Sequence, residues 1–179
     1  MHLVKLDIAR LQVETAITLY FNEGDPVSIH TLAAAGSDIL EALVNQMGGM
    51  SALESFLEKY IHEEYQEEVR LELRIPQNFF KHADRDPDAV IDFHPAQTRF
   101  ILLNAGWTLT QLLGRRPALV RLFETYAAFT WAEKFLQYEP DLEIPSEFLL
   151  QVKGSTKSDF YTQMLPFAKA VAEINNGES

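Results

Sequence analysis

The kind of fold to expect is visible in one stretch near the start of the chain, DPVSIHTLAAAGSDILEALVNQM at residues 25–47. Asp25 followed by Pro26 typically opens an α-helix, because aspartate caps free backbone N–H groups and proline suits the first turn. Apolar residues then recur at helical spacing as far as about Met47. The run at 33–36, three alanines and a glycine, has almost no side-chain bulk. The stretch therefore predicts a helix that a neighbouring helix can approach closely.

The same signals extend outward in both directions. A capping residue or a proline precedes most apolar-periodic segments, and a glycine often follows one. These signals place helical segments at 3–22, 25–47, from 51 onward, from 76 onward, 95–113, 117–138 and 159–174, with a linker at 139–158 and a kink at Pro166. Residues 69–73 alternate in a way that also allows an extended segment. We predict an all-α, single-domain bundle over residues 1–179, with about six mostly antiparallel helices.

Composition narrows the functional classes. The chain has 179 residues, of which 47% are hydrophobic, so it is long enough and apolar enough to bury a core. Its formal net charge is −11, which repels nucleic acid unless a local basic patch is present. Cysteine is absent, which excludes disulfides, thiolate catalysis and cysteine-ligated metals.

No membrane segment, metal site or cofactor site is predicted. No apolar run approaches the roughly 20 residues that cross a bilayer, and the N-terminus lacks a signal-peptide core, so we expect a cytoplasmic protein. The five histidines are scattered, and Glu58 and His62 lie one helical turn apart, a spacing that a metal could use. Phosphate-loop and nucleophile-elbow patterns are missing. A packing role is expected for His30 and a core position for Trp107 and Trp131.

The stretch from Arg74 to Asp88, RIPQNFFKHADRDPD, gathers polar, titratable and aromatic residues. Pro76 is expected to begin a helix here, because proline disfavours helical geometry in the residue before it. Asn78 and His82 would then share one helix face, being four residues apart. Histidine titrates near neutral pH, so the helix face with Asn78 and His82 is the candidate functional site that the sequence offers.

The segment Gln-Asn-Phe-Phe-Lys-His at 77–82 resembles the polar motif of HEPN domains. These are small helical bundles of toxin–antitoxin, phage-defence and RNA-processing systems. Their motif is an arginine, four to six residues and a histidine, often with an asparagine after the arginine. Asn78 and His82 match the asparagine-to-histidine spacing, whereas Gln77 occupies the arginine position. The nearest arginines are Arg74 and Arg85.

The resemblance implies a metal-independent ribonuclease whose motif pairs across a homodimer. His82 would act as general acid or base, and Asn78 would orient it or the phosphate. Lys81 or Arg74 would replace the missing arginine as the cation that stabilises the transition state, although lysine lacks the bidentate fork. Arg74 and Arg85 are the candidate substrate-binding residues.

Three functions follow as alternatives. The first is a non-catalytic or degenerate HEPN-like module of RNA-related or toxin–antitoxin type. The second is a helical interaction protein in which Asn78 to His82 only stabilise the structure, and the third is an active ribonuclease. Expected partners are a second copy of the chain, through an aromatic-rich helix, and either RNA or another protein.

Overall fold

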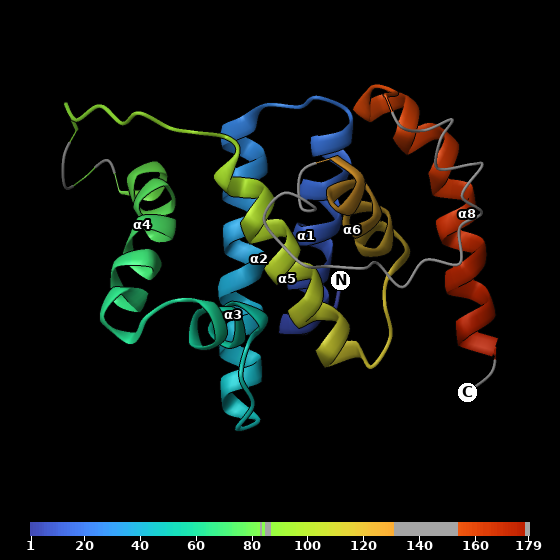
Figure 1. Cartoon of the computed structure of the whole chain (residues 1–179), viewed down its shortest axis with the longest axis horizontal. Helices are drawn as coiled ribbons and strands as arrows, with labels where there is room; N and C mark the ends of the chain where they lie inside the picture. The colour runs from blue at the N-terminus through green and yellow to red at the C-terminus, as the bar shows by residue number, and fades with distance from the viewer. Residues whose placement is uncertain (83, 85–86, 131–153, 178–179) are drawn as a thin grey trace.

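The structure is a computed structural model that describes residues 1–82, 84, 87–130 and 154–177. Within these ranges it contains seven α-helices and no strand, which confirms the all-α bundle with one helix more than expected. The helices are α1 (Lys5–Phe21), α2 (Pro26–Gln46), α3 (Ala52–Tyr60), α4 (Glu63–Lys81), α5 (Gln97–Leu113), α6 (Ala118–Thr130) and α8 (Lys157–Gly177). The long helices run in alternating directions, with α4 at one edge and α8 at the other (Figure 1).

Local chemistry sets several of the helix ends. The Asp25 carboxylate accepts a hydrogen bond from the Ser28 backbone N–H at 2.7 Å, and Pro26 is the first residue of α2, as predicted. Ser51 Oγ likewise accepts from the Glu54 N–H at 3.3 Å and caps α3. Gly114 ends α5 with φ of 64°, a left-handed conformation that glycine adopts without strain.

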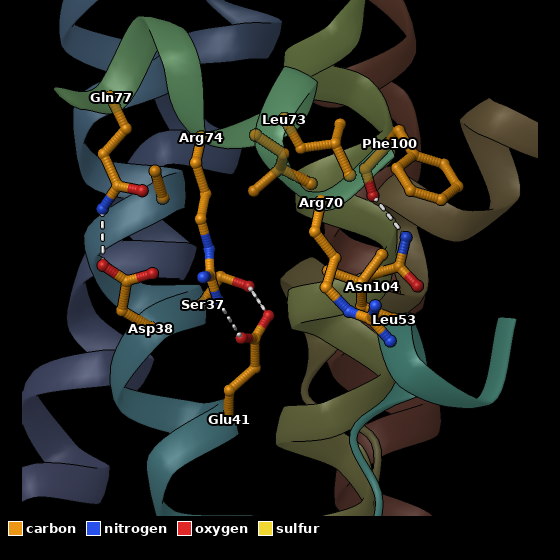
Figure 2. Close-up of a pocket in the computed structure, with 12 residues that line it drawn as sticks. Ser37, Asp38, Glu41, Leu53, Arg70, Leu73, Arg74, Gln77, Phe100 and Asn104 are labelled. Carbon is orange, nitrogen blue, oxygen red and sulfur yellow. Dashed lines mark hydrogen bonds and ion pairs between the residues drawn. The ribbon is translucent and has the colours of Figure 1, made fainter. Parts of the chain in front are cut away.

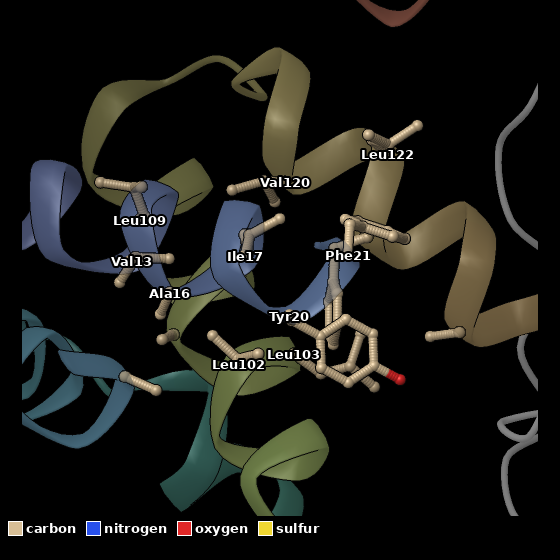
Figure 3. Close-up of a cluster of buried hydrophobic side chains, with 14 of the residues drawn as sticks. Val13, Ala16, Ile17, Tyr20, Phe21, Leu102, Leu103, Leu109, Val120 and Leu122 are labelled. Carbon is tan, nitrogen blue, oxygen red and sulfur yellow. The ribbon is translucent and has the colours of Figure 1, made fainter. Parts of the chain in front are cut away.

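The hydrophobic core lies among α1, α2, α5, α6 and α8. Figure 3 shows its centre, where Ile17, Phe21, Leu102 and Val120 meet. At one end of the core the rings of α1, α6 and α8 pack edge-to-face or stacked, with Phe21 and Phe160 stacked at 5.9 Å between centroids. Trp107 packs half-buried against the core, as predicted. Trp131, the expected continuation of α6 to residue 138 and all but the last residues of the expected linker fall in 131–153, outside the described residues.

The small-residue run of α2 has the predicted effect. An added Cβ on Gly36 would stand 2.8 Å from Val13 Cγ2 and 3.2 Å from the Ala9 carbonyl oxygen of α1. Contacts this short show that α1 and α2 are too close at this point for any larger residue. The bulk-free run therefore brings two core helices together.

Two local predictions around α4 are wrong. Residues 69–73 are helical, and Pro76 does not begin a helix but lies inside α4, between Ile75 and Gln77. Pro76 still lacks a backbone N–H, so α4 loses one internal hydrogen bond there. The helix forms nonetheless because its strong amphipathic pattern lets one face dock on the bundle.

The α2 helix also differs from expectation, since by length and composition alone it could cross a membrane. In the fold one side of it packs on α1 and α5, with Ala33, Leu40 and Val44 buried. Core helices of soluble proteins pass the same length and composition test.

Candidate functional site

The candidate site of the sequence lies on α4, which docks on α2 and α3 through polar side chains. We call this set the polar seam: Arg70, Arg74, Gln77 and Lys81 on α4, with Asp38 and Glu41 of α2 and Glu54 of α3. The four α4 residues are spaced by three or four, so they occupy one face of the helix. Figure 2 shows Gln77 and Arg74 pointing from α4 toward Asp38 and Glu41.

The seam is strongest at its α3 end. Arg70 donates to both oxygens of Glu54, from Nε at 2.9 Å and from Nη2 at 2.5 Å. This two-point geometry is the strongest arrangement available to an arginine and a carboxylate. The hydrogen bonds from Arg70 hold the pKa of Glu54 below its usual value. Arg70 therefore serves to hold α4 against α3.

The other two cations of the polar seam, Arg74 and Lys81, also have carboxylate partners. Arg74 Nη2 lies 3.8 Å from Glu41 Oε2, and Lys81 Nζ lies 3.9 Å from Asp38 Oδ2. Burial raises the pKa of Glu41, and the nearby Arg74 charge opposes that rise. The two cations that were candidates to replace the missing arginine are thus paired with carboxylates of α2.

Gln77, at the position where the HEPN motif has its arginine, faces the inside of the molecule. It is 5% exposed, and its Nε2 donates to Asp38 Oδ2 at 2.5 Å. The cavity between α2, α4 and α5 that Gln77 helps to line has a volume of about 30 Å³, room for about two water molecules. A nucleotide does not fit there.

Asn78 lies in the last turn of α4, whereas His82 is the residue that caps the end of this helix. The helix ends at Lys81, and His82 follows it with φ of −122° and ψ of 57°. His82 Nδ1 lies 3.8 Å from Asp84 Oδ1. Asn78 is exposed. Arg85 lies outside the described residues, and the structure leaves the proposed roles of Asn78, Lys81 and His82 as predictions.

His30 has the packing role that the sequence predicts. It is fully buried, and its Nδ1 shares a hydrogen bond with Thr98 Oγ1 at 2.9 Å. Phe80 and Phe93 meet its ring edge-to-face at 5.6 and 5.1 Å between centroids. Phe80 therefore packs the C-terminal end of α4 against α2.

The described residues contain no group of histidine, aspartate and glutamate side chains arranged to hold a metal ion, Glu58 and His62 included. The sequence signal that was missed is the spacing of Arg70, Arg74, Gln77 and Lys81. It marks a continuous helix face, but the assumed break at Pro76 concealed it.

Comparisons of the chain with protein-family models, with curated proteins and with solved structures find no match. The resemblance to HEPN domains stays a prediction that rests on residues 77–82 and on the helical pattern of the sequence.

Proposed function

We propose that this chain is a non-catalytic, HEPN-like binding module whose helix α4 presents a surface to a partner protein. The observation that carries the proposal is the position of Gln77. A residue standing in place of the phosphate-binding arginine is buried and bonded to Asp38, and the neighbouring cations Arg74 and Lys81 are paired with carboxylates. These groups hold the fold together, whereas a ribonuclease cleft needs cations directed at phosphate.

An exposed face of α4 beside the polar seam supports binding. We call it the outer face of α4: Glu64, Glu68, Leu71, Ile75 and Asn78, all exposed and spaced by three or four residues. Leu71 and Ile75 are 55% and 46% exposed. Such a stripe on a helix is typical of contact with another amphipathic helix.

The charge of this face favours one class of partner. Glu63, Glu67 and Glu72 are exposed on the same helix beside Glu64 and Glu68. RNA and a second copy of the same face would both meet like charge, which costs affinity and slows encounter. A basic amphipathic helix of another protein complements both the carboxylates and the apolar pair Leu71 and Ile75.

Binding is tested with a labelled amphipathic helical peptide of leucine and lysine, measured by fluorescence anisotropy. The double variant Leu71→Ser/Ile75→Ser keeps every charge and is expected to weaken binding by more than about tenfold, because two apolar contacts are lost. The matched control is Leu11→Ser/Val27→Ser, which removes two exposed apolar residues of α1 and α2. Equal affinity of the two double variants would refute the outer face of α4 as the binding surface.

Catalysis is tested by incubating a mixed RNA pool with the wild-type chain and with His82→Ala. We expect neither to cleave, since the motif lacks a cation free to reach phosphate among the residues described around it. Cleavage by the wild type that is lost in His82→Ala would replace this proposal with the ribonuclease alternative.

A further inference from the structure

A second cavity, unrelated to α4, lies where α1 and α8 meet the connection between α5 and α6. Its volume is about 200 Å³. One side carries Arg10 and Glu14 of α1, and another carries Lys169 and Glu173 of α8, each pair one helical turn apart. The connection between α5 and α6 adds a third cation, Arg115. The residues that line it are Arg10, Glu14, Leu113, Arg115, Pro117, Ala118, Lys169, Ala172 and Glu173.

The three cations of this cavity are unpaired within the part of the chain that the structure describes. Arg10, Arg115 and Lys169 form neither an ion pair nor a side-chain hydrogen bond there. Elsewhere the described cations Arg70 and Arg116 do have carboxylate partners. Arg10 Nε is in addition buried and has no acceptor among the described residues. Because a buried donor without a partner is costly, a cavity that keeps one is prepared for a ligand that accepts hydrogen bonds.

The carboxylates of the cavity do not cancel this positive charge. Glu14 and Glu173 each stand one turn from a cation of their own helix, yet neither is within ion-pair distance of one. Burial raises the pKa of Glu14, and the charges of Arg10 and Arg115 oppose that rise. Three cations against two carboxylates give a locally positive site in a chain whose net charge is −11. Local cavities of this kind concentrate anions.

We propose that this cavity binds a small organic anion through a phosphate or carboxylate head group held by Arg10, Arg115 and Lys169. Arginine offers paired N–H donors that match both head groups. The carbon part of the ligand lies against the apolar wall formed by Leu113, Pro117 and Ala172. The volume is below the roughly 300 Å³ at which pockets for drug-sized ligands begin, so the ligand is a short-chain metabolite. Arg115 and Lys169 are exposed, which places the entrance on their side.

The test uses the full chain and isothermal titration calorimetry at low ionic strength. Inorganic phosphate, succinate and the uncharged glycerol are the probes. We expect saturable millimolar or tighter binding of phosphate, succinate or both, and none of glycerol. The tighter of the two anions identifies the head group. Failure of both anions to bind would overturn the proposal.

Three variants separate this site from general attraction to positive charge. Arg115→Gln and Lys169→Gln are both at exposed positions and are each expected to weaken the anion that binds by about tenfold. The matched control, Lys59→Gln, removes an exposed cation of α3 and should leave affinity unchanged. Equal weakening by all three would overturn the proposal.

A fourth variant is expected to gain affinity, which a misfolded protein cannot do. Glu14→Gln removes a carboxylate that competes with the ligand for Arg10 and Arg115. We expect anion binding several-fold tighter than in the wild type. Unchanged or weaker binding would refute the placement of the head group between these two arginines.

Discussion

At the scale of single residues, Glu124 of α6 is a glutamate held in the interior. It is 2% exposed, and Arg116 Nε lies 3.3 Å from its Oε2. Burial raises the pKa of Glu124 to about 7, against the opposing charges of Arg116 and Arg121. The folded chain therefore holds a proton on this group at pH values where the unfolded chain has lost it.

This raised pKa has a measurable consequence for stability. Between pH 4.5 and about 7 the folded state binds one more proton than the unfolded state, so the contribution of Glu124 to stability falls as pH rises. The whole change is about 3 kcal/mol. Glu124→Gln should remove this slope and be more stable than the wild type at pH 8, measured by urea unfolding. Glu58→Gln, which removes an exposed carboxylate, is the control and should keep the wild-type profile.

His30 contributes a slope of the opposite sign. Burial lowers the pKa of His30 from its ordinary value of 6.5 to about 4. Between these values the unfolded state binds the extra proton, so stability falls as pH falls through that window, by up to about 3 kcal/mol. His30→Asn keeps a polar group near Thr98 but does not ionise. It should flatten the profile between pH 6.5 and 4, and a wild-type slope in the variant would show that another group titrates.

At the scale of elements, the contact between α1 and α2 depends on Gly36. In an unobstructed helix Gly→Ala stabilises by about 0.5–1 kcal/mol. Here the added methyl group meets Val13 at 2.8 Å and the Ala9 carbonyl at 3.2 Å, so Gly36→Ala should destabilise by about 1–3 kcal/mol. Thermal unfolding measures the sign directly, and a stabilised variant would mean that α1 shifts away without cost.

At the scale of the whole molecule, α4 is a peripheral element. Its buried residues are Pro76 and Gln77, whereas α1 buries six residues of its helix, among them Val13 and Ile17. Figure 1 shows it at one edge of the bundle. Helices with few buried apolar contacts open at low free-energy cost, separately from the core.

Hydrogen exchange should resolve this hierarchy. The amides of α4 are expected to exchange faster than those of α1, α2 and α5. Glu54→Gln weakens the two-point contact with Arg70. It should therefore accelerate the exchange of the α4 amides further and leave the exchange of the α1 amides unchanged. Glu58→Gln on the same short helix has no such contact in the described structure and is the control. Exchange of α4 in step with α1 would identify a single cooperative unit.

The sequence by itself determined the all-α class and most of the helix boundaries. Caps such as Asp25 and Ser51 and the terminator Gly114 act within one helical turn, so adjacent residues are enough to predict them. The same local rules failed at Pro76, because docking of one face of α4 outweighed the proline's preference for a helix start. His82, expected inside that helix, lies immediately after its last residue.

Only the tertiary structure determined which polar and charged side chains of this protein lie next to one another. Gln77 meets Asp38 across 39 positions of sequence, and Arg10, Arg115 and Lys169 surround one cavity from three distant segments. Such meetings depend on how the helices pack, which no local pattern contains. Gln77 and Lys81 of the motif thus joined the polar seam, while three cations with no ion-pair partner among the described residues came together where the sequence had no signal.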